Sequence, residues 1–469
     1  MFAIDASVRT RRHYLILAAG ALMAQPSFAR AEPPESTLAR IKEFNPWLSA
    51  EDPLELPLKV HSLLRDEYTF FRGTADFYYD WCRDNCRDWL KSDDVLFLHG
   101  DVHLGNIGTY RSVSGNRFAV VDLDETFSGP YQLDVLRGLL SLRFAASDNR
   151  IELSQSDRTA LIDRYLESYA EGLSGRLTAD DLEDRYPLVK SLLKKAREAS
   201  AAEYAGKFCT GKPLNRFQPT RQKKGRVSDI MMPVDQKTRD TIASAIRTLL
   251  TTDNVGFNAV PIKPRVEPKD ILDVVQWSRI DSGGSQGVRK YLVLVAPNDA
   301  WDNAPLILQL KEEPVPAVDR AGLPNAPSKT ERATRVANQY LLLIDPMPWL
   351  TGHVKVDGRG FLVRTKDPFS EEPESDDFKT RDALMQGAKL LGETLGRAHR
   401  AGLRLIKGQH RIPQIAAQIK TLAPEFATRS DAAMEYLHGV YLNLKHDGEA
   451  QKMVDTAKRR IDEARKAGA

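Results

Sequence analysis

A short stretch of the chain concentrates polar side chains of the types that handle phosphate chemistry. It reads FLHGDVHLGNIGTY from Phe97, and FAVVDLDETFSGPYQLDVLR follows it after a short gap. In-line phosphoryl transfer needs a carboxylate beside the attacking hydroxyl, and oxygen ligands for the magnesium that bridges the phosphates. Asp101 can fill the first role, and Asn106 and Asp122 the second. The spacing therefore predicts a magnesium-dependent phosphotransferase centre, which transfers a phosphoryl group or, as an alternative, a nucleotidyl group.

Two short strands should position these residues. Residues 95–98 are apolar and precede the Gly-containing segment with Asp101 and Asn106, so a strand should deliver both into a loop. Residues 118–121 form a second β-rich run, which Asp122 ends. Side-by-side strand ends would bring the oxygen ligands to one ion. Asp124 and Glu125 follow directly; they could hold a second metal ion, with Asp124 as a further candidate ligand, or face a cationic substrate.

The order of these residues is similar to a known family pattern. His99-Gly-Asp-x-His103-x-x-Asn, then Val-Asp and, twelve residues later, Asp134, resembles the aminoglycoside-phosphotransferase branch of the protein-kinase-like fold. The resemblance implies that Asp134 braces the catalytic loop. More closely, FFRGTADFYYD, GDVHLGNIG, ILQLKEE and GRAHRAG resemble a bacterial family known as domain of unknown function 2252, over roughly residues 60 to 402.

A nucleotide-binding lobe is expected after the catalytic segment, in permuted order. Residues 273–279 and 290–296 are predicted strands around a glycine-rich turn, and 306–310 is a third strand that ends in Lys311. Lys311 would bind the phosphates of ATP or another nucleotide, and Glu331 on the next helix would orient it, although Glu312 and Glu313 are closer in sequence. Backbone N–H groups of the turn would approach phosphate oxygens at Gly283, Gly284 and Gly287.

We therefore expect an α+β fold, a two-lobe protein-kinase-like architecture with permuted order and helical additions. The expected parts are a signal peptide (1–31), N-terminal helices with the catalytic segment (32–150), a helical insertion or subdomain (151–265), the antiparallel nucleotide-binding sheet lobe (266–366) and C-terminal helices (367–469). Residues 367–377, rich in Pro, Glu and Asp, are predicted to be a flexible linker.

The first residues predict export. VRTRRHYLILAAGALMAQPSFARA combines a basic head, an apolar core and Ala-x-Ala, as in a secretory signal, and Arg11-Arg12 resembles the twin-arginine motif. The mature protein should be periplasmic or secreted, without a membrane span. Because ATP is scarce outside the cytoplasm, another phosphorylated donor stays open.

Composition narrows the class of partner. The chain has 469 residues, 42% of them hydrophobic, and a net charge of +3, which argues against a nucleic-acid binder. The acceptor is an unknown small molecule or protein, and the basic cluster in residues 216–226 could recruit an anionic one. Cys82, Cys86 and Cys209 are expected to be unpaired thiols.

Two alternatives come from other classes. His99, Asp101, His103 and Asp122 could bind a transition metal for hydrolysis, since imidazole and carboxylate are its usual ligands. The chain could also be a pseudokinase-like binding protein that keeps the fold without turnover.

Overall fold

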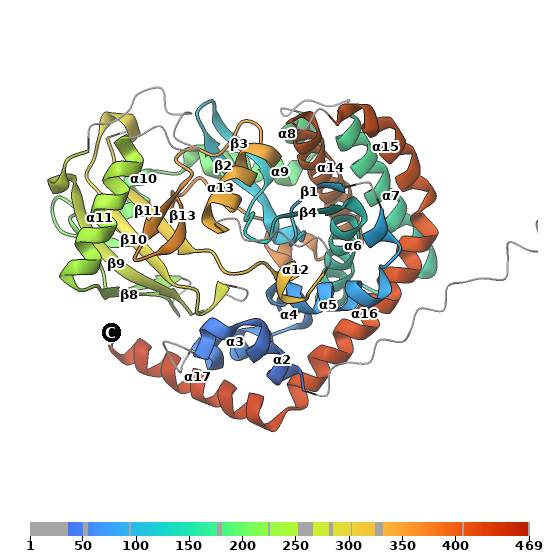
Figure 1. The fold of residues 1–469 in the computed structure, drawn as a ribbon, viewed down its shortest axis with the longest axis horizontal. Coiled ribbons are helices and arrows are strands. Elements are labelled where there is room, and N and C mark those ends of the chain that lie inside the picture. Colours follow the sequence, from blue (N-terminus) through green and yellow to red (C-terminus); the bar gives the residue numbers. More distant parts are fainter. Residues whose placement is uncertain are drawn as a thin grey trace, which may run out of the picture.

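The computed structural model describes residues 36–49, 55–92, 95–175, 181–223, 226–251, 266–280, 285–301, 303–323, 332–405 and 408–467. A sheet-rich half and a helical half lie side by side, on the left and right of Figure 1. The combination of a large antiparallel sheet with many helices confirms the α+β class. Residues 1–31, for which the sequence predicts a signal peptide, lie outside the described ranges.

The sheet-rich half is built on seven antiparallel strands. Their order is β12-β13-β11-β10-β9-β8-β7. The strands expected at 273–279, 290–296 and 306–310 all form, and a hairpin of two more strands follows from residue 352. Two further strands come from the segment expected to be helical, so the sheet begins well before residue 266. The strands are β7 (Thr220–Lys223), β8 (Arg226–Pro233), β9 (Ile271–Arg279), β10 (Lys290–Val295), β11 (Leu306–Glu312), β12 (Gly352–Val356) and β13 (Arg359–Thr365).

The two faces of this sheet differ. One face is apolar and packs on α11 (Gln236–Thr251), which lies in front of the sheet in Figure 1; Ile246 of the helix shares a buried cluster with Val293 and Leu308. The other face is apolar only at one end, where Leu292 and Ile307 pack with Phe208 beside α10 (Ala201–Gly206). The remainder of that face is polar and points toward the helical half.

The helical half surrounds a buried core. The most extensive contact between two of its helices joins α14 (Arg381–Leu405) to α7 (Gln155–Ser174). A Cβ at Gly392 of α14 would lie only 2.3 Å from the carbonyl oxygen of Tyr165 on α7. Glycine therefore sets how closely these helices approach. The other helices are α2 (Thr37–Phe44), α3 (Glu55–Leu63), α4 (Glu67–Gly73), α5 (Ala75–Asn85), α6 (Tyr131–Asp148), α8 (Asp181–Arg185), α9 (Pro187–Glu198), α12 (Ala317–Arg320), α13 (Arg332–Leu343), α15 (Ile412–Thr421), α16 (Ala423–His446) and α17 (Gly448–Ala467).

Residues 95–130, which contain the predicted catalytic segment, form two small pairs of antiparallel strands between the halves. β1 (Val95–Leu98) pairs with β4 (Phe127–Pro130), and β2 (Ile107–Ser112) pairs with β3 (Gly115–Val120). We expected the strands before Asp101 and Asp122 to be neighbours. Instead, β1 and β3 belong to different pairs. Their ends still meet, because the backbone N–H of Val121 donates to the carbonyl oxygen of Asn106 (2.8 Å).

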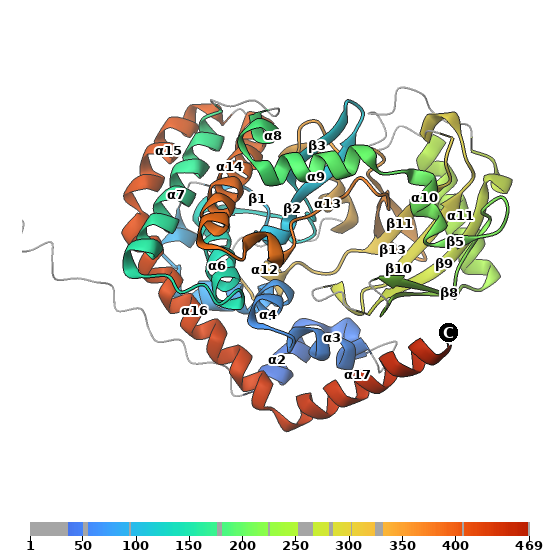
Figure 2. The same cartoon turned by 180° about the vertical axis from the view of Figure 1, so that it is seen from behind.

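Several segments hold the halves together. The stretch expected to be a flexible linker, 367–377, is instead fixed to β2: the Thr109 hydroxyl donates to the Phe369 carbonyl oxygen (2.7 Å), and the Glu371 N–H donates to Thr109 Oγ1 (2.8 Å). Helix α17 runs beneath both halves along α3 and reaches β8, as both views show (Figures 1 and 2).

The three cysteines are buried free thiols, which confirms that they form no disulfide. In the part of the chain that the structure describes, no helix has both the length and the apolar character needed to cross a membrane.

Candidate functional site

A cleft of about 1290 Å³ separates the catalytic segment from the polar face of the sheet. The sequence-predicted residues Asp101, Asn106 and Asp122 line its helical side, and Lys311 lines its sheet side. These residues come from segments about 200 positions apart in the chain. Gly283, Gly284 and Glu331 lie outside the described residues, so their predicted roles stay predictions. Further residues that line the cleft are Asp124, Glu125, Arg279, Lys290, Gln309, Arg364 and Lys366.

Asp134 holds the loop that carries Asp101 through hydrogen bonds to the loop backbone. This side chain is fully buried in the first turn of α6, and its carboxylate accepts hydrogen bonds from the backbone N–H groups of His99 (2.6 Å) and Gly100 (3.0 Å). A third bond comes from His399 Nε2 on α14 (3.1 Å). Because a carboxylate only accepts, His399 donates through Nε2, and its Nδ1 accepts from the Tyr169 hydroxyl (2.9 Å). The geometry gives Asp134 the bracing position that the sequence predicted.

Gly100 is required at its position. Its φ is +84°, a region that favours glycine, and a Cβ there would lie 2.0 Å from the carbonyl oxygen of Glu125. The close approach brings the loop against the segment that follows Asp122. A side chain at position 100 would push the two halves of the catalytic segment apart.

Arg137 is a site residue that the sequence analysis missed. It is fully buried on α6, and its Nε donates to Asp101 Oδ1 (2.8 Å); its Nη2 reaches the same oxygen and the Phe71 carbonyl oxygen. Burial opposes the charge on Arg137, but the Asp101 carboxylate outweighs it and raises the arginine pKa. The signal was the spacing Asp134-x-x-Arg137, which puts both side chains on one helix face toward the loop.

Asn106 connects the loop to the metal-ligand candidates. Its side-chain Nδ2 donates to the carbonyl oxygen of Asp101 (2.9 Å), and the residue is buried at the cleft wall. Because the amide nitrogen is used within the loop, the amide oxygen is the atom that is left for a ligand.

Asp122 and Asp124 each carry a buried oxygen that accepts no hydrogen bond from the protein. Asp122 has a φ of +60°, and both Asp122 Oδ1 and Asp124 Oδ1 are buried atoms with no hydrogen-bond partner. Burial opposes ionisation of Asp122, but Lys311 and Arg364 outweigh it and lower the pKa of its carboxyl group. Arg364 Nη2 lies 3.7 Å from Asp122 Oδ1, and the Lys311 ammonium forms an ion pair with Asp124.

These residues could hold a magnesium ion. Magnesium takes oxygen ligands, typically one or two carboxylates together with substrate phosphates. Asp122 Oδ1, Asp124 Oδ1 and the amide oxygen of Asn106 are oxygen atoms of these kinds, and all three residues line the cleft. The donor set therefore fits magnesium bound together with a phosphate ligand.

Lys311 has a second acidic neighbour in Glu313. Glu313 follows two positions later at the end of β11, is buried, and has no hydrogen-bond partner for either carboxylate oxygen. Burial raises the pKa of this carboxyl group to about 7, although Lys311 and Arg335 act in the opposite direction. The lysine itself pairs with Asp124.

The described part of the glycine-rich turn packs on the N-terminal helices. Gly287 has a φ of +74°, and a Cβ there would lie 2.3 Å from Leu48 Cδ2. The neighbouring Gln286 donates to Glu55 of α3, while Ser285 lines the cleft. Packing against Leu48 accounts for the glycine at 287.

The two histidines of the loop serve its internal structure. His99 Nε2 bonds the Val121 carbonyl oxygen (2.8 Å), and its Nδ1 accepts from the Asp101 N–H (3.2 Å), so both ring nitrogens are used. His103 Nδ1 accepts from the Gly105 N–H (3.1 Å), and burial together with the cation of Arg72 holds its pKa well below the usual value. Within the described ranges, no group of three or more His, Cys, Asp or Glu side chains is arranged to hold a metal.

Replacement of Asp134 by Asn should loosen the catalytic loop. The amide would present an N–H₂ group to one of the backbone N–H donors of His99 and Gly100 and leave that donor unsatisfied, at a cost of about 1–3 kcal/mol in unfolding free energy. Denaturant unfolding should show a lower midpoint at unchanged slope. Asp163→Asn, at an exposed position of α7, is the control. An unchanged midpoint for Asp134→Asn would contradict the bracing role.

Glu313→Gln should stabilise the protein at alkaline pH. The folded-state pKa is about 7, above the ordinary glutamate value, so the folded form binds the extra proton and stability falls as pH rises from about 4.5 through 7. Glutamine has no such cost, and Lys311 keeps Asp124 as its partner. The variant should gain roughly 2 kcal/mol more at pH 8.5 than at pH 5, as measured by denaturant unfolding at both values. A pH-independent difference would argue against a protonated Glu313.

The comparisons with known proteins identify the family. Neither a curated protein nor a solved structure matches the chain. A family model described as "Uncharacterized protein conserved in bacteria (DUF2252)" matches residues 51–441, which cover most of the chain and nearly all of the fold described above. The resemblance seen in the motifs at Phe70, Gly100 and Gly396 is thereby confirmed, and the chain belongs to the DUF2252 family.

Proposed function

We propose that this protein is a magnesium-dependent phosphotransferase with a permuted protein-kinase-like architecture. One observation carries the proposal: Asp101, Asn106 and Asp122 line a single cleft together with Lys311, and the cleft contains buried carboxylate oxygens that accept no hydrogen bond from the protein. Phosphoryl transfer needs little covalent chemistry from the protein beyond positioning and charge stabilisation. The residues that face this cleft are of the types that supply both.

The order in which the strands of the sheet follow one another along the chain supports the same proposal. Strand β9, the glycine-containing turn, β10 and the Lys311-bearing β11 follow one another, and helix α13 and the β12–β13 hairpin come next. This is the order of a kinase nucleotide lobe, placed after the catalytic loop instead of before it. Helix α14, which comes after the sheet in the chain, packs on β1 and supplies His399 to the catalytic brace, as a permuted fold requires.

Asp101 is best suited to orient the acceptor hydroxyl. Arg137 occupies Oδ1, so Oδ2 is the oxygen available to a ligand; His103 Nε2 is 3.7 Å from it. A carboxylate locked in this way holds a hydroxyl in one direction and can take up its proton during transfer. The acceptor remains an unidentified small molecule or protein with a hydroxyl group.

Asn106, Asp122 and Asp124 would hold magnesium, which when bound neutralises negative charge on the phosphates. Lys311 would contribute a second positive charge at the same wall of the cleft, from the sheet side. Asp124 would exchange its present partner Lys311 for the ion. The export signal in residues 1–31 supports a periplasmic or secreted location for this activity.

The ion pair between Lys311 and Asp124 also favours a second candidate, a binding protein without turnover. In that case the pair would persist, and neither residue would be available to magnesium or phosphate. The transition-metal hydrolase is disfavoured, because both ring nitrogens of His99 and the Nδ1 of His103 are already used within the loop, which leaves Nε2 of His103 as the one imidazole nitrogen of these two residues for a metal.

Two aspartate variants test the proposal. With ATP or GTP and magnesium at about 100 times the dissociation constant, the mature chain should gain about 2.7 kcal/mol in stability, measured by thermal unfolding. Asp122→Ala should abolish this gain because it removes a metal ligand, whereas Asp101→Ala should keep the gain and lose phosphoryl transfer. The control is Asp163→Ala on the surface of α7.

Other outcomes of the same experiment separate the candidates. Equal losses in Asp101→Ala and Asp122→Ala would contradict the assigned roles. A gain with zinc alone would favour the metal hydrolase. A gain without magnesium, unaffected by Asp122→Ala, would favour the binding protein.

A further inference from the structure

The wall of the cleft formed by the sheet is unusually rich in cations. Directly paired residues of antiparallel strands point to the same face, and so do residues two apart on one strand. Lys290 pairs with Lys311, Gln309 pairs with Arg364, and Lys366 lies two positions beyond Arg364. The cations that the register assigns to this face and that line the cleft are Arg221, Arg279, Lys290, Lys311, Arg364 and Lys366.

Two of these cations are held without an anionic hydrogen-bond partner. Lys290 is only 4% exposed, and its Nζ donates to the carbonyl oxygen and the hydroxyl of Ser285, both neutral, at 2.8 Å. Lys366 Nζ lies 4.5 Å from the ring centre of Trp277. Burial and the nearby charge of Arg279 lower the pKa of each lysine to about 7. The cations therefore repel one another, and an anion would relieve the repulsion.

Several acids near this wall are already engaged, and burial raises the pKa of two more near Arg364, Glu313 and Glu372. Asp229, on the same face, accepts from Arg221 (3.0 Å) and Trp277 Nε1 (2.9 Å). Glu55, which faces Lys290 from α3, accepts from Gln286 and from the Ser278 hydroxyl. Across the cleft, Asp122 and Asp124 face Arg364 and Lys311 and are the metal-ligand candidates. Lys290, Arg279 and Lys366 are left to an incoming anion.

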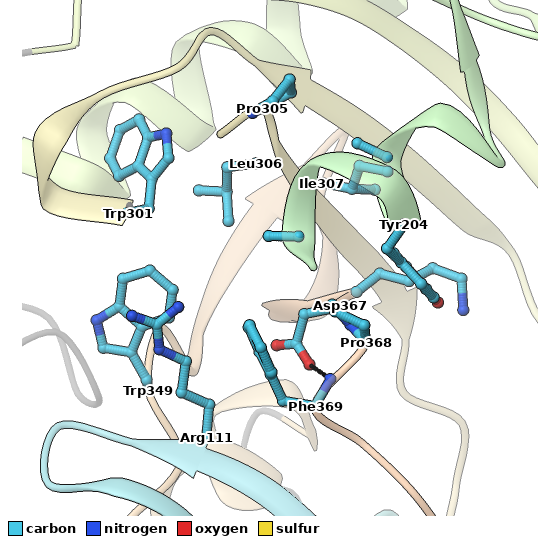
Figure 3. Close-up of a pocket in the computed structure, with 13 residues that line it drawn as sticks. Arg111, Tyr204, Trp301, Pro305, Leu306, Ile307, Trp349, Asp367, Pro368 and Phe369 are labelled. Atoms are coloured by element: carbon cyan, nitrogen blue, oxygen red, sulfur yellow. Dashed lines mark hydrogen bonds between the residues drawn. The ribbon is translucent and has the colours of Figure 1, made fainter. Parts of the chain in front are cut away.

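In the described part of the chain, the apolar end of the same face is covered by Phe208, Cys209 and Phe217. Beyond Lys366 the space narrows to a cavity of about 20 Å³, room for about one water molecule. Figure 3 shows aromatic side chains around this cavity, and the Arg111 guanidinium lies 4.4 Å from the Trp349 ring centre and 5.1 Å from that of Phe369. A ligand on this wall is therefore recognised by its charges.

We propose that the sheet wall of the cleft binds a chain of phosphates, and that the phosphoryl donor is inorganic polyphosphate. This inference rests on the proposed phosphotransferase function and names its donor. Neighbouring strands are about 4.8 Å apart, so a flexible chain with a negative charge at every repeat contacts cations on several strands at once. Its terminal phosphate would reach Lys311 on β11 and the candidate magnesium ligands across the cleft.

The transfer step balances without any further reactant. The bond between the terminal phosphorus and its bridging oxygen breaks, and that oxygen leaves with a chain one phosphate shorter. The acceptor hydroxyl oxygen forms the new bond to the phosphorus, and its proton passes by way of Asp101 to solvent. No atom changes oxidation state.

Calorimetric titration with sodium tripolyphosphate, long-chain polyphosphate and ATP, each with magnesium, tests this inference. Long-chain polyphosphate should bind most tightly, and tripolyphosphate should bind at least as tightly as ATP, which has the same number of phosphates. The Lys366→Met and Arg279→Gln double variant should weaken long-chain polyphosphate at least tenfold and reduce the salt dependence of binding. Lys452→Met, an exposed lysine on α17, is the matched control. Arg279→Gln alone, at an exposed position, serves if the double variant does not fold.

The contrary outcomes are distinct. ATP that binds more tightly than tripolyphosphate would overturn the polyphosphate inference and leave the phosphotransferase proposal standing. Heparin or single-stranded DNA that binds as tightly as polyphosphate without magnesium would identify a general polyanion surface and overturn it as well. Unchanged binding in the double variant would place the phosphates elsewhere. If every phosphate ligand binds equally well without magnesium and to the Asp122→Ala variant, the result would instead contradict the phosphotransferase function.

Discussion

The candidate site depends on one buried carboxylate. Asp134 has no contact with solvent, and the structure satisfies it with two backbone N–H groups of the loop and with His399 from a helix 265 residues away. Burial of a charged group is tolerated only with such a set of donors, here at the first turn of α6, where the helix dipole also favours a negative charge. Because the donors belong to the loop, folding of the core fixes the direction of Asp101.

Charge separation across the cleft is the second constraint. The helical side presents Asp101, Asp122 and Asp124, and the sheet side presents Lys311 and Arg364. Such opposite walls attract one another, and the Lys311–Asp124 pair is the point where they meet. Because both side chains are nearly buried, the ion pair also avoids the free-energy cost of leaving either charge buried without a partner.

The sequence predicted the features that depend on local pattern. Local sequence pattern located strands β9, β10 and β11, and polar residues beside expected strands indicated Asp101, Asn106, Asp122 and Lys311, which line one cleft. Features set by distant partners could not be read in this way. The pairing of β1 with β4, the addition of β7 and β8, and the tethering of 367–377 to Thr109 all depend on tertiary contacts. The cationic wall likewise requires the register between strands.

The cationic wall bears on the tension between export and a nucleotide site. A pocket for ATP would normally devote apolar surface to the base, and such surface is useful only where the nucleotide is plentiful. Here the apolar part of the sheet face is covered by Phe208 and its neighbours, while the open part carries Lys290, Lys366 and Arg279. A site that recognises charge rather than a base would suit the predicted export to a compartment with little ATP, so the proposed polyphosphate donor is compatible with both predictions.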